Sequence, residues 1–166
     1  MSGDNDRASL MARVSLRNPI HFLALGFGTG LAPKAPGTVG TLAALPLYLL
    51  FVPLPLWGYL LATLVVVLVG IPICDRAARD FGVHDHPAIV WDEVAGFLIT
   101  MIAAPVGVVW LILGFVLFRF FDVLKPWPIR WLDRRVGGGF GIMVDDVLAG
   151  LFAAVCLQLV VLGVGA

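Results

Sequence analysis

Five acidic side chains stand beside the long uncharged stretches of this sequence, and they come from three separate segments. They are Asp92, Glu93, Asp122, Asp145 and Asp146. Carboxylates held side by side repel one another, and a divalent cation would relieve that repulsion. Hard oxygen ligands suit Mg²⁺, which usually takes one or two carboxylates together with substrate phosphate. The pattern therefore predicts a Mg²⁺ site in which these five residues act as metal ligands or as the catalytic base.

The same acids also have simpler structural interpretations. Asp145 or Asp146 could cap the N-terminus of the last helix, where a side-chain oxygen accepts a backbone N–H. Asp122 lies one helical turn from Arg119 and could serve only to pair with it. Adjacent helical residues point about 100° apart, so neither acidic pair is expected to chelate one ion alone. The sequence leaves the metal site and these alternatives open.

Candidate phosphate ligands accompany the acids. Basic side chains follow residues 94–118, and a glycine-rich segment, residues 18–46, adds hydroxyls and a lysine. Glycine lets backbone N–H groups approach an anion closely, and Lys and Arg bind phosphate oxygens directly. The candidates for substrate binding are Lys34, Thr38, Thr41, Arg119 and Lys125, with His21 as a further candidate that could instead be a hydrogen-bonded histidine at the interface.

The composition indicates which elements must position these residues. Of 166 residues, 60% are hydrophobic and 13% are charged, against about 25% charged in soluble domains. Residues 35–74, 94–118 and 147–166 contain no charge and no histidine, and roughly 20 apolar residues of helix cross a bilayer core. The sequence therefore predicts an all-α integral membrane bundle. Its eleven basic and eleven acidic residues balance, so nucleic acid is not an expected partner.

The number of membrane crossings depends on two breaks. Prolines within 53–58 divide the first uncharged stretch into two helices. Residues 94–118 could form one kinked span or a hairpin of two shorter helices, and the hairpin keeps all eleven Lys and Arg on one side. The positive-inside rule favours that arrangement and makes the charged side cytoplasmic. We therefore predict four membrane segments, a short interfacial or re-entrant element over 20–33, and a polar tail (1–17) before one membrane-embedded domain (18–166).

Four blocks of the sequence match a known pattern in order and spacing. They are NPIHFLALGFGTGLAPKAPGTVGTLAALP (18–46), VWDEVAG (90–96), FRFFDVLKPWPI (118–129) and GIMVDDVLAG (141–150). Through them the chain resembles the phosphatidylglycerophosphatase A family of bacterial membrane lipid phosphatases. The resemblance implies Mg²⁺-dependent removal of the terminal phosphate of phosphatidylglycerophosphate, which gives phosphatidylglycerol. The sequence leaves open whether a metal-activated water or a carboxylate, through an acyl-phosphate, attacks that phosphate. It also implies a multi-pass protein of the bacterial inner membrane, whose partners are this lipid and the bilayer.

Two other classes of function compete with a phosphatase. A phosphotransferase that uses a CDP-activated alcohol would need an Asp-Gly-x2-Ala-Arg sequence, which is absent. An ion carrier would place acids near the middle of the membrane, whereas the uncharged stretches hold none there. Release of phosphate from lipid in detergent, with no ion gradient, separates an enzyme from a carrier.

Overall fold

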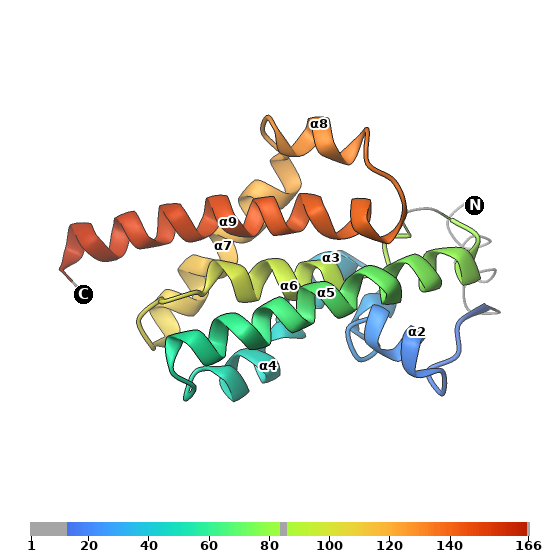
Figure 1. Ribbon diagram of the computed structural model, residues 1–166, viewed down its shortest axis with the longest axis horizontal. Coiled ribbons are helices and arrows are strands. Elements are labelled where there is room, and N and C mark those ends of the chain that lie inside the picture. The colour runs from blue at the N-terminus through green and yellow to red at the C-terminus, as the bar shows by residue number, and fades with distance from the viewer. Residues whose placement is uncertain (1–12, 84–85, 166) are drawn as a thin grey trace.

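The computed structural model describes residues 13–83 and 86–165, and every regular element in that part of the chain is helical (Figure 1). The all-α prediction is confirmed. Of the predicted polar tail, residues 1–12 lie outside the described residues. The elements are α2 (Pro19–Ala24), the 3-10 turn η1 (Thr29–Leu31), α3 (Pro36–Leu42), α4 (Ala44–Phe51), α5 (Leu56–Phe81), α6 (Trp91–Thr100), α7 (Val108–Leu124), α8 (Ile129–Asp133) and α9 (Gly138–Val164).

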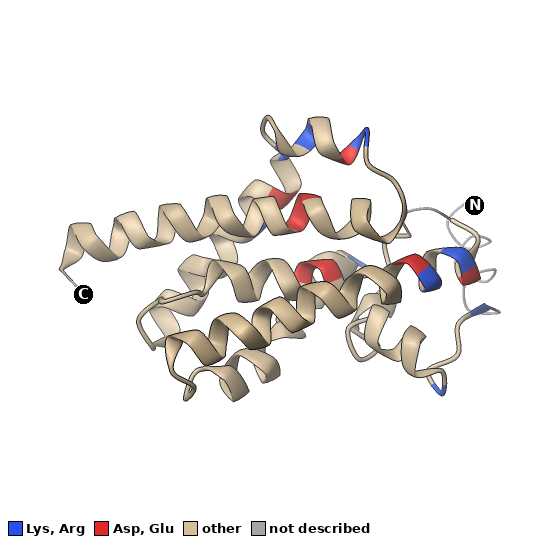
Figure 2. Ribbon diagram, viewed as in Figure 1, with Lys and Arg blue, Asp and Glu red and all other residues tan. Residues whose placement is uncertain are grey.

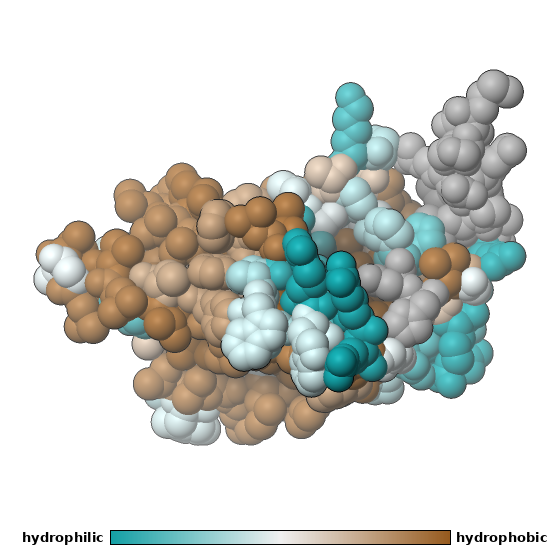
Figure 3. All heavy atoms as spheres, turned by 90° about the horizontal axis from the view of Figure 1, so that it is seen from above, coloured by the Kyte–Doolittle hydropathy of each residue, from teal (hydrophilic) through white to brown (hydrophobic). Residues whose placement is uncertain are grey.

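Two of these helices are long and apolar enough to cross a bilayer. α5 has 26 residues and α9 has 27, and only 28% of the most apolar stretch of each is buried. The core helix of a soluble protein would be mostly buried, whereas these helices expose leucine and valine side chains along much of their length. This hydrophobic surface gathers at one end of the molecule (Figure 3).

The described helices do not clearly provide the four membrane segments predicted. The break at the prolines is present, because α4 ends at Phe51 and α5 begins at Leu56. The hairpin turn is also present, between α6 and α7. However, residues 36–51 form two short helices, and α6 and α7 have only 10 and 17 residues. Proline and glycine end helices that the absence of charge alone would extend.

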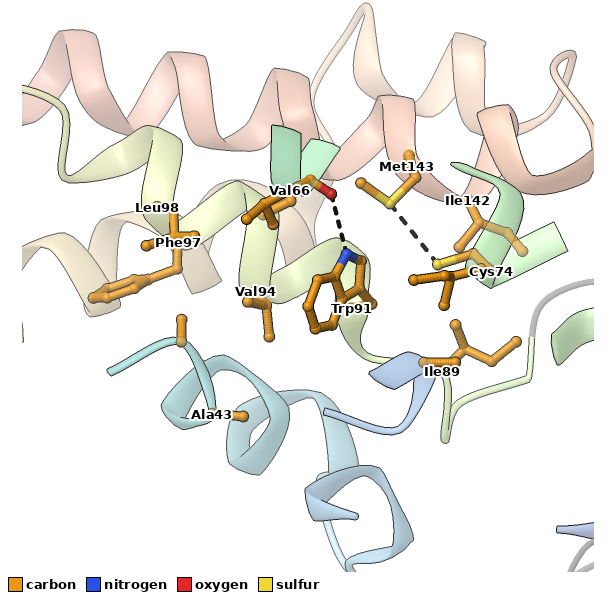
Figure 4. Packing of buried hydrophobic residues seen from close by; sticks show 14 of the residues in the cluster. Ala43, Val66, Cys74, Ile89, Trp91, Val94, Phe97, Leu98, Ile142 and Met143 are labelled. Atoms are coloured by element: carbon orange, nitrogen blue, oxygen red, sulfur yellow. Dashed lines mark hydrogen bonds between the residues drawn. The ribbon is translucent and has the colours of Figure 1, made fainter. Parts of the chain in front are cut away.

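α6 lies between α5 and α9 at the centre of the molecule (Figure 1). Small residues allow its close approach to α9, since a Cβ built on Gly150 would lie 2.4 Å from the carbonyl oxygen of Gly96. On the other side, the indole Nε1 of Trp91 donates to the carbonyl oxygen of Val66 in α5 over 3.1 Å (Figure 4). This bond satisfies a buried donor. The two contacts hold the first turn and the middle of α6, and the first turn carries the first acidic pair.

Charged residues occupy one half of the described ribbon, while the N-terminal part of α5 and the C-terminal part of α9 carry none (Figure 2). Within the charged half, a cluster fastens α2 to α5. His21 Nε2 lies 3.1 Å from Asp80 Oδ2, and Arg76 Nε lies 3.0 Å from Asp80 Oδ1. The acids of α6 and α9 lie closer to the apolar half, at the boundary between the two (Figure 2).

Candidate active site

A cavity of about 340 Å³ opens where α3, α6, α7 and α9 meet, and we refer to it as the carboxylate cavity. Residues from all four helices line it, so the site is assembled only when the chain is folded. Its charged and hydroxyl-bearing lining consists of Thr38, Asp92, Glu93, Arg119, Asp122, Lys125, Asp145 and Asp146. The structure therefore brings all five predicted acids into one site, together with three of the six predicted substrate-binding residues.

The acidic pair of α9 lies in the interior of its helix. The helix begins at Gly138 and its N-cap is Gly137, so Asp145 and Asp146 lie more than a turn beyond the first residue. The capping interpretation is therefore wrong for this pair. The uncharged stretch begins only after Asp146, but a helix continues through charged residues whose side chains reach a polar cavity.

Arg119 joins α7 to the start of α6. Its Nη1 lies 3.2 Å from Glu93 Oε1, and the same nitrogen pairs with Asp122. The predicted pairing of Asp122 with Arg119 is therefore confirmed, although both residues also line the cavity. Asp92 and Glu93 lie in the first turn of α6, where the helix dipole favours negative charge. One guanidinium thus links carboxylates from two helices at the cavity wall.

Lys125 also links carboxylates from two helices. Its Nζ pairs with Asp145 of α9 and lies 2.9 Å from Asp133 Oδ1 at the end of α8. Burial lowers the pKa of Lys125, but the hydrogen bonds and charges of Asp145 and Asp133 raise that pKa more, so the net shift is upward. The two carboxylates therefore stabilise the protonated amine. Sequence reasoning missed Asp133, because the turn into α8 brings it back to Lys125.

The carboxylate cavity carries excess negative charge. Five carboxylates and two cationic side chains line it, so negative charges outnumber positive ones by three when all are ionised. Asp146 is 3% exposed, and it forms no ion pair within residues 13–83 and 86–165. Burial of a carboxylate without a counter-charge is unfavourable. A bound cation would supply that counter-charge.

The donor chemistry of the cavity fits Mg²⁺. In the described part of the chain, no three His, Cys, Asp or Glu side chains converge closely enough to hold a metal ion by themselves. Mg²⁺ does not require such a cluster, because it keeps several waters and binds one or two carboxylates together with substrate phosphate. The cavity offers oxygen ligands and excess negative charge, and its buried Asp146 carboxylate forms no ion pair with a described residue.

Three predicted substrate-binding residues do not line the cavity. Thr41 is fully buried, and its hydroxyl donates to the carbonyl oxygen of Gly37 over 2.8 Å. Lys34 is exposed outside the lining. His21 accepts a hydrogen bond from the backbone N–H of Ser15 at Nδ1 over 3.2 Å, and its Nε2 faces the α5 carboxylate described above. The alternative interpretation of His21, a hydrogen-bonded histidine, therefore describes its position.

The glycines of α3 have a role that the sequence does not reveal. We expect from the sequence that they approach an anion, but in the structure they approach Glu93. A Cβ built on Gly37 would lie 2.0 Å from Glu93 Oε1, and one built on Gly40 would lie 2.7 Å from Glu93 Oε2. Their spacing, three residues apart on one helical face, is the signal that could have indicated a close contact. These glycines make room for a side chain of the site.

The fold and cavity define a class: a helical protein with membrane-length apolar helices and an open cavity that combines acidic and cationic groups. The family model for phosphatidylglycerophosphatase A matches residues 22–161. Phosphatidylglycerophosphatase A of Escherichia coli (strain K12) is 49% identical over 144 residues, which are 86% of this chain and 84% of that protein. The protein of the same name from Haemophilus influenzae is 47% identical over 149 residues, 87% of this chain and 90% of that one.

The chain belongs to the phosphatidylglycerophosphatase A family. The membership predicted from the four sequence blocks is thereby confirmed. The search of solved structures returned no significant match.

Proposed function

We propose that the protein hydrolyses the terminal phosphate monoester of phosphatidylglycerophosphate, consuming water and releasing phosphatidylglycerol and inorganic phosphate. The names of its relatives support this substrate. The observation that carries the proposal is the carboxylate cavity, where five acids accompany Arg119 and Lys125 beside the apolar half of the molecule. The phosphate monoester of a membrane lipid is presented at this kind of boundary.

Arg119, Lys125 and Thr38 are the proposed ligands of the phosphate oxygens. Carboxylates hold both cations at the wall of the cavity before substrate arrives, so little reorganisation is needed on binding. Guanidinium and ammonium groups form charge-assisted hydrogen bonds with phosphate. The two cations also offset part of the repulsion between the cavity acids and a dianionic phosphate.

The five cavity acids are the proposed Mg²⁺ ligands, and one of them takes the proton of the attacking water. When bound, Mg²⁺ would supply positive charge that polarises the phosphate group. Asp146 has the strongest claim to a ligand role, because it is buried and forms no ion pair with a described residue. Asp92 and Asp122 reach the same cavity from α6 and α7. The full set is Asp92, Glu93, Asp122, Asp145 and Asp146.

The proposal extends to the membrane. α5, α9, the two arms of the α6–α7 hairpin and residues 36–51 would supply the membrane-embedded segments in the bacterial inner membrane, with the carboxylate cavity open to the cytoplasmic face. The part of α9 from Val147 to Val164 is about 27 Å long at roughly 1.5 Å per residue. This length approaches the hydrocarbon thickness of about 30 Å. The segregation of charge into one half supports a single charged face.

Hydrolysis in detergent tests this function. Purified protein in uncharged micelles with Mg²⁺ should release phosphate from phosphatidylglycerophosphate and accumulate phosphatidylglycerol in equal amounts. A phosphotransferase would instead need a CDP-activated alcohol and would release CMP, and a carrier would release nothing. Folded protein that leaves the lipid intact, with Mg²⁺ present, would overturn the proposal.

A further inference from the structure

A second cavity lies beside the carboxylate cavity, and we refer to it as the arginine cavity. It has a volume of about 560 Å³ and opens around the chain from Leu124 through α8 to Arg135. Arginine and tryptophan dominate its lining, which includes Trp127, Arg130, Trp131, Arg134 and Arg135. Figure 3 views the molecule from the side on which α8 lies, and hydrophilic side chains gather there.

The arginines of this cavity have no partner carboxylate in the part of the chain that the structure describes. None of Arg130, Arg134 and Arg135 forms an ion pair with a carboxylate among the described residues. The nearby carboxylate of Asp133 is engaged by Lys125 at 2.9 Å. In contrast, the arginines at the end of α5 and in the carboxylate cavity all pair with acids. The arginine cavity therefore presents guanidinium groups that suit an external anion, above all a phosphate.

Two exposed indole rings indicate that this anion belongs to a membrane lipid. Trp127 is 81% exposed and Trp131 is 47% exposed, and the guanidinium carbon of Arg135 lies 4.8 Å from the centroid of the Trp131 ring. Exposed tryptophan is typical of the headgroup layer of a bilayer, where one edge of the ring is apolar and the other is wet. The stacked arrangement also holds Arg135 in place. A phospholipid headgroup is therefore the expected occupant.

Lys125 connects the two cavities, because it lines both of them. A lipid with one phosphate in the carboxylate cavity would thus place its second phosphate beside the arginine cavity. The proposed substrate has two phosphates, a phosphodiester and a terminal monoester, separated by one glycerol. The carboxylate cavity has excess negative charge and would repel a second phosphate. In contrast, every charged side chain that lines the arginine cavity is cationic.

We propose that the arginine cavity binds the phosphodiester of an anionic phospholipid headgroup, and that it holds the diester of the substrate while the carboxylate cavity holds the monoester. The assignment to the substrate rests on the proposed function. The same cavity accepts phosphatidylglycerol, the product, which keeps the diester. Headgroups that end in an ammonium group are disfavoured, since the guanidinium groups repel it.

Binding without turnover provides the first test. The full-length protein is held in uncharged detergent with EDTA, and its affinity for phosphatidylglycerol is measured by the ligand-dependent rise in Tm, with phosphatidylcholine as the comparison lipid. The double variant Arg134→Gln/Arg135→Gln should bind phosphatidylglycerol at least about tenfold more weakly, as expected for the loss of charge-assisted hydrogen bonds. The matched control Arg17→Gln/Arg79→Gln removes two exposed arginines outside both cavities and should bind as the wild type does.

Kinetics provide the second test. In the same uncharged micelles, the KM for phosphatidylglycerophosphate should rise at least about tenfold in the double variant while kcat stays within about twofold, because uniform binding is lost. Inhibition by sn-glycerol 3-phosphate, a monoester without a diester, should not change. That arm separates the lipid diester from free phosphate as the ligand.

The outcomes also separate this proposal from the proposed function. Unchanged phosphatidylglycerol affinity in the double variant would overturn the arginine cavity as a diester site. A KM increase seen only in phosphatidylglycerol vesicles, and not in uncharged micelles, would mean attraction to a charged surface and would overturn it as well. If the wild type binds phosphatidylglycerol through these arginines but releases no phosphate, only the proposed phosphatase activity fails.

Discussion

Among the single side chains of the carboxylate cavity, the acids differ in whether a protein cation already neutralises them. Asp122 pairs with Arg119 and Asp145 pairs with Lys125, whereas Asp146 forms no ion pair with a described residue. Asp92 and Asp122 are proposed metal ligands, and asparagine removes the charge with which each would hold the cation. We therefore expect Asp92→Asn and Asp122→Asn to lower kcat at least about 100-fold, roughly 2.7 kcal/mol of transition-state stabilisation. Turnover and Tm measured on the same preparations check this, and Tm should barely change because asparagine keeps the volume of aspartate.

A suitable control for those variants is Asp80→Asn. Asp80 lies in the cluster that fastens α2 to α5, and an asparagine oxygen can still accept from His21. Its turnover should match the wild type. Asp133 would not be a suitable control, because it contacts Lys125. Wild-type turnover in both Asp92→Asn and Asp122→Asn would mean that the site assignment is wrong.

Metal removal is expected to separate binding from catalysis. EDTA should abolish turnover and Mg²⁺ should restore it. Mg²⁺ should also raise the Tm of the wild type, because a ligand that binds only the folded state stabilises it. In Asp146→Asn, that rise should disappear, since this buried carboxylate forms no ion pair with a described residue and a cation would supply its counter-charge. Thermal unfolding with and without Mg²⁺ measures this directly, and full turnover after exhaustive chelation would contradict a metal role.

At the scale of helices, α3 and α6 meet through glycine. In Gly37→Ala the new Cβ would lie 2.0 Å from Glu93 Oε1 and 3.2 Å from Arg119 Nη1, so both side chains must move. We expect kcat to fall at least about tenfold as positioning is lost, while the helix itself is not weakened, because alanine favours helix over glycine by about 1 kcal/mol. The rate of phosphate release measures the fall in kcat, and circular dichroism checks that the helix content of the variant is unchanged.

The matched control is Gly163→Ala in α9. A Cβ there meets no atom within 4 Å, so the same chemical change is made without a collision. Its activity should equal that of the wild type. Equal activity of Gly37→Ala and Gly163→Ala would mean that the contact with Glu93 does not position the site.

Sequence patterns were informative where single residues act through charge or backbone geometry. The prolines near 53–55 predict the break before α5, and the spacing of the acids predicts one shared site. The start of α9 at Gly138 was not predictable from charge, because charge marks where side chains meet polar surroundings and not where backbone hydrogen bonds end. Similarly, Thr38 lines the cavity and Thr41 does not, and that choice depends on how α3 is rotated against α6.

For the whole molecule, the charge distribution predicts its orientation in the membrane. Single cysteines at Gly137, which is exposed and has φ −109°, and at Val106, which is 76% exposed in the α6–α7 turn, report on the two faces. In a variant lacking Cys74 and Cys156, an impermeant maleimide should label position 137 from the cytoplasmic side only. Position 106 should not label from that side. Cytoplasmic labelling of both positions would contradict the hairpin topology.

The position of the acidic pair along α9 also implies that turnover depends on the thickness of the bilayer. Residues 147–164 of α9 carry no charge. If α9 spans the bilayer as proposed, a thinner or thicker bilayer creates a hydrophobic mismatch that tilting or deformation of the lipid relieves. Either response moves the acidic pair of α9 relative to the plane of the lipid phosphates. Turnover measured in bilayers of graded acyl-chain length should therefore pass through a maximum, with its position set by the register of α9.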